Sequence, residues 1–453
     1  MIIGGTKRET IEKWSLLYGM LKPIVDFIFR TYFKTFSYRE EEFDKNDILI
    51  YAPNHQNALM DALAILATYK GEPVFLARAD IFEKKTISKI LTFLKILPIY
   101  RIRDGKTNLQ NNEATFQKTI DVLKERKRLT ILPEGNHAGR RKLRTVKKGI
   151  SRIAFQAEEA TNFSMGIKIV PVGLDYQHYY HVQSRLTVYY GKAIPLEQFV
   201  EEYKANPPRG MNLLREEVGR QLKKYMVHIK SETYYETIDT LAKVCGPLLA
   251  KKRNGRNFSK LHLLKAEQSI AKTYDQLAES EEKIKPLASK VKKYNHLIKK
   301  FKFRYWVVRR APFCIFNQLG HALLQLVSFP FFVYGAINNI IPYSIPIFIT
   351  RKVKDPQFIS SFRMVVAMLL FIVFYITQTV LFASLTDFDW WVKVLYPLSL
   401  YPTGLIALHH YTGWKKLISK LRYSWLKITK NKDFETLIEL HNEIIGNCQK
   451  TVK

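Results

Sequence analysis

Three long stretches near the C-terminus contain no charged side chain, and they constrain the fold more than any other feature of the sequence. Residues 311–350, 364–386 and 394–414 hold no Asp, Glu, Lys or Arg. A helix needs about 20 apolar residues to cross the hydrocarbon core of a bilayer, so the second and third stretches predict transmembrane helices. Prolines at 330, 342 and 346 interrupt the first stretch. We expect it to kink, to fold back as a re-entrant or hairpin segment, or to lie in the interface.

The charges that flank these stretches predict an orientation. Arg and Lys side chains lie on both sides of the first stretch and after the third, whereas Asp387 and Asp389 lie between the second and the third. Because positive loops stay in the cytoplasm, we expect an integral membrane protein with its soluble part and both termini on the cytoplasmic side. The alternative is that the three stretches are buried helices of a large soluble core. Uncharged runs of this length are rare in soluble helices, which disfavours that alternative.

The overall charge predicts anionic partners. The chain carries 72 Lys and Arg against 40 Asp and Glu, a net charge of +32, in 453 residues. Residues 311–453 contribute 14 basic and 7 acidic residues, so most of the excess lies before them. Such a surface attracts anionic membrane lipid, phosphorylated substrates or nucleic acid. No nucleic-acid-binding motif is present, so we expect no nucleic acid among the partners.

Metal and disulfide scaffolds are excluded by the cysteine pattern. The three cysteines lie far apart at 245, 314 and 448, and no CxxC pair occurs. Zinc ribbons, zinc fingers and disulfide-rich folds need closely spaced cysteines. We therefore expect none of these scaffolds.

Before residue 200 the hydrophobic pattern predicts an α/β fold. Short apolar strands alternate with helical segments, which favours a mostly parallel sheet covered by helices. The expected strands are 48–52, 73–77, 96–102, 129–132, 167–172 and 185–190, and the expected helices are 61–69 and 113–126. The predicted organisation is an N-terminal helix in 1–45, the α/β domain in 46–200, a basic helical region in 201–305, a membrane domain in 306–415 and a cytoplasmic tail in 416–453.

Two helical segments outside the α/β domain have specific patterns. In residues 14–36, basic and acidic side chains recur four apart at Lys22, Asp26, Arg30 and Lys34, opposite an apolar face. This predicts either an interfacial helix on anionic lipid or an ordinary amphipathic helix packed on its own domain. Residues 261–300 predict a basic helical hairpin that breaks at Pro286, preceded by a flexible linker at 251–260.

A histidine and an aspartate follow the first strand of the α/β domain. Residues 53–61 read PNHQNALMD, with five residues between His55 and Asp61. Six residues of helix turn through about 600°, so the two side chains cannot share a helical face. His55 should therefore lie in the loop before the helix and fold back toward Asp61. In that arrangement the carboxylate orients the imidazole, whose other nitrogen removes a proton from a hydroxyl. By itself the pair means little, since a helix cap beside a surface histidine is its usual interpretation.

Two further motifs follow later strands. Residues 129–144 read LTILPEGNHAGRRKLR, in which Gly135 allows a tight turn and Asn136 can bind an oxygen-rich ligand. Glu134 is expected to accept hydrogen bonds from substrate hydroxyls or a neighbouring arginine, and the basic residues after it suit phosphate. In residues 97–103, LPIYRIR, Arg101 and Arg103 should project from one face of a strand end.

These motifs, together with Val170–Gly173, resemble the four ordered motifs of the glycerophospholipid acyltransferase family, over about residues 50–175. The resemblance implies that His55 is the general base and that Asp61 is its partner. It implies a substrate-binding role for Asn54, Arg101, Arg103, Glu134 and Gly135. Asn136 and His137 replace the usual threonine and arginine, so phosphate binding would pass to Arg140, Lys142 or Arg144.

The family moves a fatty acyl group from a CoA or carrier-protein thioester to a glycerol hydroxyl, and the resemblance implies that no metal or cofactor is needed besides this donor. The resemblance therefore implies a membrane-bound glycerol-3-phosphate or 1-acylglycerol-3-phosphate acyltransferase in phospholipid synthesis. Because an arginine is missing at position 137, an aminolipid or other non-phosphate acceptor is an alternative. A third possibility, a non-catalytic basic membrane scaffold, would not explain the ordered motifs.

Overall fold

The computed structural model describes residues 11–100, 111–137 and 139–452. The chain divides into two compact units. The first comprises Met1–His228 together with a separate short segment, Lys354–Ser361, and the second comprises Ile229–Val353 and Phe362–Lys453. The predicted α/β domain lies within the first unit.

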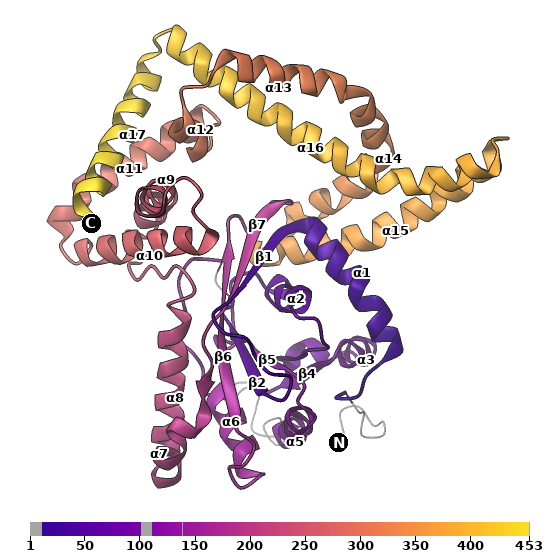
Figure 1. Cartoon of the computed structure of the whole chain (residues 1–453), viewed down its shortest axis with the longest axis vertical. Helices are drawn as coiled ribbons and strands as arrows, with labels where there is room; N and C mark the ends of the chain where they lie inside the picture. The colour runs from indigo at the N-terminus through magenta and orange to yellow at the C-terminus, as the bar shows by residue number, and fades with distance from the viewer. Residues whose placement is uncertain (1–10, 101–110, 138, 453) are drawn as a thin grey trace. The chain divides into compact units, whose positions relative to one another are not determined.

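An eight-stranded sheet forms the centre of the first unit (Figure 1). Its strand order is β1-β7-β6-β2-β5-β3-β4, with β8 paired to β6. Only the β6–β7 and β6–β8 pairs are antiparallel, so the expectation of a mostly parallel sheet is confirmed. The strands are β1 (Phe33–Arg39), β2 (Ile48–Pro53), β3 (Val74–Arg78), β4 (Ile96–Ile99), β5 (Leu129–Ile131), β6 (Ile167–Tyr176), β7 (Ser184–Tyr190) and β8 (Ile194–Pro195).

Helices cover both faces of this sheet. Alternate side chains of the strands, such as Ile50 and Ala52, pack in one apolar core with α5, α6 and α8. Their neighbours Leu49 and Tyr51 are equally buried, because α2 covers the opposite face. The helices of the unit are α1 (Leu16–Tyr32), α2 (Leu59–Thr68), α3 (Lys85–Phe93), α5 (Asn111–Lys124), α6 (Gly149–Glu159), α7 (Val200–Ala205) and α8 (Pro207–Leu222), with 3-10 turns at Ala79–Phe82, Leu196–Phe199 and Pro356–Phe358.

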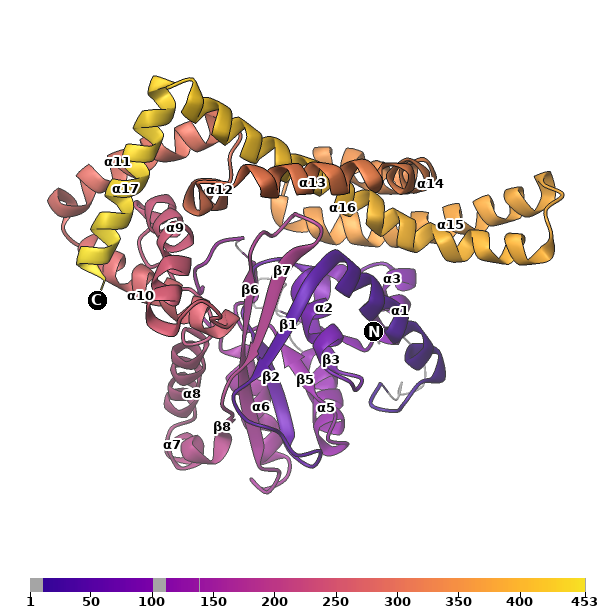
Figure 2. The same ribbon diagram turned by 45° about the horizontal axis from the view of Figure 1, so that its top comes forward.

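The helix expected over residues 14–36 is shorter than its pattern suggested. Helix α1 ends at Tyr32, and residues 33–39 form β1, which pairs in parallel with β7 and lies beside it in Figure 2. Pairing with a distant strand outweighs the local helical pattern here, so Lys34 leaves the four-residue series.

Helix α1 turns its polar stripe toward the protein. Lys22 pairs with Asp26 at 2.5 Å and donates to the Leu66 carbonyl at 3.0 Å, and Arg30 donates to the Ala67 carbonyl. These carbonyls belong to the last turn of α2, where cations are favourable. The large apolar side chains of α1 and its approach are consequently exposed: Trp14, Leu16, Leu17, Met20, Ile24 and Phe27. An ordinary amphipathic helix would bury them.

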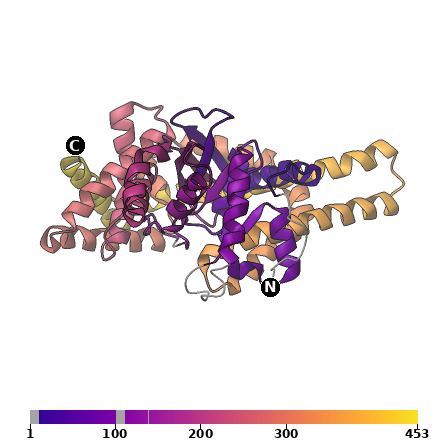
Figure 3. The ribbon, with the colours of Figure 1, turned by 90° about the horizontal axis from the view of Figure 1, so that it is seen from below.

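The second unit is helical throughout its described residues. Its helices are α9 (Tyr235–Asn254), α10 (Lys260–Leu277), α11 (Glu281–Lys300), α12 (Tyr305–Arg310), α13 (Ile315–Val327), α14 (Phe329–Ile349), α15 (Ile359–Leu385, whose first turn belongs to the first unit), α16 (Trp390–Ile428) and α17 (Lys432–Thr451), with a 3-10 turn at Thr350–Lys352. Figure 3 shows α15 and α16 as two long orange helices joined at one end by a short loop.

Two boundary predictions in this unit are wrong. The hairpin breaks at residues 278–280 and not at Pro286, which lies inside α11. Ser280 precedes α11, and Glu281 and Glu282 occupy its first turn, where the helix dipole favours acidic residues. The linker expected at 251–260 is shorter than predicted, because α9 continues to Asn254 and α10 begins at Lys260. A disulfide joins α9 to α17 through Cys245 and Cys448, which the sequence pattern did not indicate.

The uncharged stretches form long helices. Two helices of the described residues, Phe329–Lys352 and Pro356–Leu385, are long and apolar enough to cross a membrane. The stretch at 311–350 is interrupted where α13 ends at Val327 and α14 begins at Phe329, close to Pro330, whereas Pro342 and Pro346 lie inside α14. The expected span at 394–414 lies inside α16 and is not among the two, since prolines, tyrosines and two histidines make it less apolar. The predicted topology stays a prediction.

Candidate active site

The sequence motifs meet at one edge of the sheet. Strand β2 lies between β5 and β6 and is parallel to both, so Pro53, Ile131 and the C-terminal part of β6 lie at the same edge. The carboxyl ends of neighbouring parallel strands are the usual place for a ligand site in such sheets. Arg101 and Arg103, which the third motif places after β4, lie outside the described residues.

His55 and Asp61 form the predicted pair. His55 follows β2 in the loop before α2, and its Nδ1 lies 2.8 Å from Oδ2 of Asp61. Asp61 is completely buried, whereas 15% of the His55 side chain is exposed. The loop turns back through Ala58, whose φ of 45° lies in the left-handed region. This conformation costs free energy in a non-glycine residue, and it lets the side chain before the helix reach one inside its first turn.

Three further donors fix the Asp61 carboxylate. Oδ2 accepts the backbone N–H groups of Gln56 at 2.7 Å and Asn57 at 2.8 Å, and Oδ1 accepts the Tyr176 hydroxyl at 2.7 Å. An ionised Asp61 can only accept hydrogen bonds, so the proton between Nδ1 of His55 and Oδ2 of Asp61 belongs to Nδ1. Nε2 is therefore left as the basic nitrogen. Burial beside Asp61 raises the pKa of Tyr176 well above its usual value, so its hydroxyl remains a donor.

Glu134 joins two loops of the site. Its Oε1 accepts the His55 N–H at 2.6 Å and its Oε2 accepts the Arg144 N–H at 2.7 Å. Only 1% of Glu134 is exposed, and burial raises the pKa of its carboxyl to about 8 in spite of these two donors. In the structure Glu134 thus positions His55 through the backbone. Its contact with substrate hydroxyls stays a prediction.

Asn54, Gly135 and Asn136 fix the conformation of the loops at the site. Asn54 is buried, and its side chain bonds to the backbone N–H and carbonyl of Leu174 at 2.6 and 3.3 Å, which fastens the end of β2 to β6. Gly135 has a φ of 65°, which a residue with a Cβ rarely adopts, and it makes the tight turn expected after β5. Asn136 is exposed beside it and accepts the His137 N–H at 3.0 Å.

His137 lies against the ring of His55. Its ring contacts the His55 ring edge to face, with 5.1 Å between centroids and 86° between planes. Burial and the nearby His55 lower its pKa, so the ring is neutral near pH 7. A neutral His137 does not replace the charge of the arginine that it stands for.

Basic side chains follow His137 on the same loop. Arg140 and Arg144 are exposed and Lys142 is half-buried, and Nη1 of Arg144 donates to the His137 carbonyl at 3.2 Å. Arg141, by contrast, is buried, and its guanidinium lies 3.7 Å from Asp175. Arg140 and Arg144 are thus the exposed arginines of this loop.

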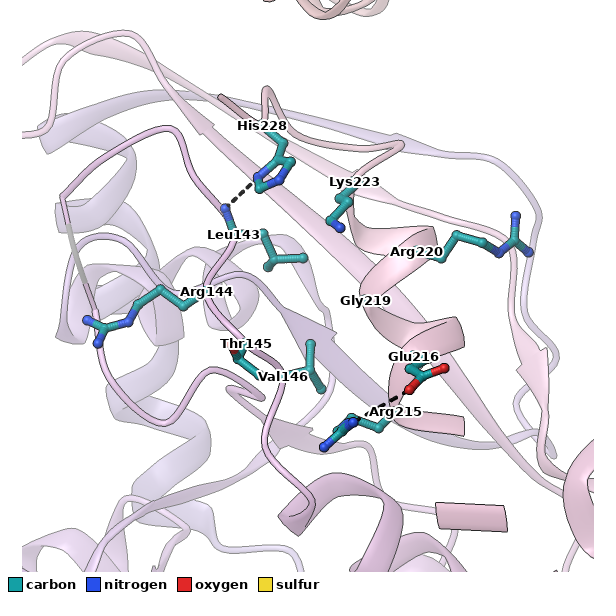
Figure 4. A pocket seen from close by; sticks show the side chains of 10 residues that line it. All are labelled: Leu143, Arg144, Thr145, Val146, Arg215, Glu216, Gly219, Arg220, Lys223 and His228. Carbon is teal, nitrogen blue, oxygen red and sulfur yellow. Dashed lines mark hydrogen bonds and ion pairs between the residues drawn. The ribbon is translucent and has the colours of Figure 1, made fainter. Parts of the chain in front are cut away.

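A cavity of about 550 Å³ lies between this loop and α8 (Figure 4). Nδ1 of His228 accepts the Leu143 N–H at 3.0 Å, which leaves the Nε2 of His228 as a donor. The cavity is lined by four cations and one carboxylate, namely Arg144, Arg215, Arg220, Lys223 and Glu216. Phosphate groups fit this charge balance.

Sequence reasoning missed several participants. Tyr176 lies at the end of β6, four residues past the expected strand, and it carried no motif. Asp355 and Phe358 contact His137 from a segment that the sequence placed beside the membrane. Within the described residues, no cluster of three or more His, Cys, Asp or Glu side chains could hold a metal ion.

Comparison with known proteins identifies this part of the chain. Residues 35–175 match the model of the Acyltransferase family. Over 115 residues the chain is 34% identical to glycerol-3-phosphate O-acyltransferase 2 of Saccharomyces cerevisiae, a match that covers 25% of this chain and only 14% of the yeast protein.

Among solved structures, the 1-acyl-sn-glycerophosphate (LPA) acyltransferase PlsC of Thermotoga maritima matches 46% of this chain and 80% of its own, with 15% identity and a TM-score of 0.33. The family match spans the His55–Asp61 pair, Glu134 and the β6 strand end. Residues 35–175, less than half of the chain, are therefore the part that is similar to the acyltransferases.

Proposed function

We propose that the protein transfers a fatty acyl group from a CoA or carrier-protein thioester to a hydroxyl of glycerol-3-phosphate or 1-acylglycerol-3-phosphate. The observation that carries this proposal is the 2.8 Å contact between His55 and the fully buried Asp61. It leaves Nε2 of a partly exposed histidine as a base at the edge of the sheet. The names of the matched relatives, which are acyltransferases for glycerol 3-phosphate and its 1-acyl derivative, support the acceptor class.

In this mechanism the acceptor hydroxyl attacks the carbonyl carbon of the thioester while Nε2 of His55 takes its proton. Asp61 stabilises the imidazolium that forms. The tetrahedral intermediate then expels the thiolate, which takes the proton from His55, and the products are an ester and a free thiol. A positioned base of this kind contributes typically 10²–10⁴-fold in rate.

The cations near His55 account for the phosphates of both substrates. Arg140, Lys142 and Arg144 follow Glu134 on one loop and would hold the acceptor phosphate. The cavity beside Arg144 would take phosphates of the donor, because CoA and the carrier-protein arm are both phosphorylated.

We also propose that the protein is bound to the membrane with this site on the cytoplasmic side. Two long apolar helices support this, as do the exposed apolar side chains of α1. A contiguous apolar face with cations on the opposite face is typical of helices that lie in the interface. The interfacial alternative for α1 is therefore the one we adopt.

The test is acyl transfer by membranes that contain the full chain, with glycerol-3-phosphate and 1-acylglycerol-3-phosphate compared as acceptors. His55→Ala should abolish the product, and His296→Ala, at an exposed histidine of α11, serves as the matched control. Each acceptor would be tested with acyl-CoA and with acyl carrier protein.

Each outcome discriminates between the functions considered. If neither acceptor gives a product, the result favours an aminolipid acceptor, because neutral His137 stands where the family has an arginine. Activity that survives His55→Ala would refute the mechanism. Equal loss in the His296→Ala control would show that the assay reports on folding and not on the base.

A further inference from the structure

The short segment Lys354–Ser361 belongs to the catalytic unit, although it is distant from that unit in sequence. It connects α14 and its 3-10 turn to α15, the two helices that are apolar enough to cross a membrane. Asp355 caps a 3-10 turn over Pro356–Phe358 by accepting the Gln357 N–H at 3.1 Å. The segment therefore has a defined local structure that presents Asp355 and Phe358 together.

Both side chains contact His137. The Phe358 ring lies edge to face against the His137 ring, with 4.8 Å between centroids and 88° between planes. The His137 ring also contacts the His55 ring, with 5.1 Å between centroids. His137 is thus held between the proposed base and a side chain of the segment. Nε2 of His137 lies 3.6 Å from Oδ2 of Asp355, which favours a proton on that nitrogen.

The backbone holds the segment against the same loops. The Tyr179 carbonyl accepts the Ser360 hydroxyl and, at 3.3 Å, the side-chain amide of Asn57. Asn57 belongs to the turn that fixes Asp61. One carbonyl therefore joins the segment to the turn between the base and its partner.

A glycine allows the segment to lie this close. A Cβ added at Gly139 would lie 3.2 Å from Cγ of Gln357, tighter than ordinary contact. Gly139 also has a φ of 58° and donates its N–H to the Gln56 carbonyl at 3.2 Å. Gly139 therefore lies next to both Gln357 of the segment and Gln56 of the loop after β2.

We infer that residues 354–361 form a wall of the active site, in which Asp355 and Phe358 are positioning residues that hold His137 and, through it, His55. This inference rests on the proposed acyl transfer. It goes beyond that function because it assigns part of the site to the chain between two apolar helices. Asp355 sets which nitrogen of His137 carries the proton, and Phe358 sets the plane of the ring.

The kinetic test uses the full chain in detergent or membranes. Asp355→Asn and Phe358→Ala should lower kcat roughly 10- to 100-fold, with the KM of both substrates little changed, because small errors in positioning reduce the rate more than binding. Asp355→Glu, which keeps the charge, should retain more activity than Asp355→Asn. Asp387→Asn, an exposed carboxylate in the loop after α15, is the matched control and should behave as the unmutated protein.

A second measurement does not depend on activity. Diethyl pyrocarbonate modifies accessible histidines, and mass spectrometry of peptides separates His55, His137 and the exposed His296. Phe358→Ala should speed the modification of His137 several-fold and leave that of His296 unchanged. Unchanged modification of His137 would refute the wall. Faster modification with unchanged kcat would refute the positioning role. A protein that shows this protection but transfers no acyl group would refute the proposed function alone.

Discussion

Replacing Asp61 by asparagine tests the geometry of the catalytic pair most directly. Oδ2 of Asp61 accepts from Nδ1 of His55 and from two backbone N–H groups, whereas Oδ1 accepts only from the Tyr176 hydroxyl. An asparagine must therefore place its oxygen where Oδ2 is, since an NH₂ group there would face three donors. Tyr176 can turn its hydroxyl to accept from that NH₂ group. Asp61→Asn should keep the fold and the proton on Nδ1, and remove only the negative charge.

The loss of that charge gives the expected magnitude. A hydrogen bond to a charged group contributes about 1.5–3 kcal/mol, and here the charge stabilises the imidazolium that forms in the transition state. At about 1.36 kcal/mol per tenfold, kcat/KM should fall by roughly 10- to 150-fold. By contrast, an aspartate-to-asparagine change that leaves the histidine of a Ser-His-Asp triad in the wrong tautomer lowers kcat about 10⁴-fold.

The assay is steady-state acyl transfer by the purified full chain, with thermal unfolding measured in parallel. Asp61→Ala is the comparison variant, since it leaves two buried backbone N–H groups without an acceptor. Each such group costs about 1–3 kcal/mol, so this variant should melt at a lower temperature. A folded Asp61→Asn protein that is as active as the unmutated one would refute the role of the Asp61 charge. One that is as inactive as His55→Ala would refute the assignment of the proton to Nδ1.

Two further predictions follow, one from the buried carboxyl of Glu134 and one from the exposed apolar side chains of α1. Because burial raises the pKa of Glu134 to about 8, the folded chain keeps a proton that the unfolded chain releases above about pH 4.5, and the free energy of unfolding should fall as the pH rises from about 5 to 8. Glu134→Gln should reduce this slope in thermal unfolding, and parallel slopes would contradict the prediction. A polarity-sensitive fluorophore on Leu17→Cys, in a Cys314→Ser background, should shift to the blue in anionic vesicles, whereas one on Leu213→Cys of α8 should not; equal spectra would contradict an interfacial α1.

Local pattern was sufficient to predict much of the sheet and the pair at its edge. The expected strands after residue 46 all occur within a few residues of their predicted bounds, because buried parallel strands read as short apolar runs. The six-residue spacing of His55 and Asp61 already required a loop that folds back. A motif within one loop can be predicted because its partners are neighbours in sequence.

Features that depend on distant partners were not predicted. Strand β1 was read as helix because its pairing with β7 leaves no local signal, and the orientation of α1 depends on the carbonyls at the end of α2. Glu134 could be expected to accept hydrogen bonds, but the donors are backbone N–H groups, and one of them comes from the loop that carries His55.

The sequence by itself therefore determined the arrangement: a histidine that folds back onto a carboxylate, a mostly parallel sheet and a basic loop after its central strands. Only the tertiary structure decided what surrounds that arrangement. Asp355 and Phe358 reach His137 from between two apolar helices, and no periodicity or spacing connects them to the motifs. The physical reason is that side-chain contacts between segments remote in sequence are set by packing in three dimensions, whereas strand and loop motifs are set by neighbouring residues.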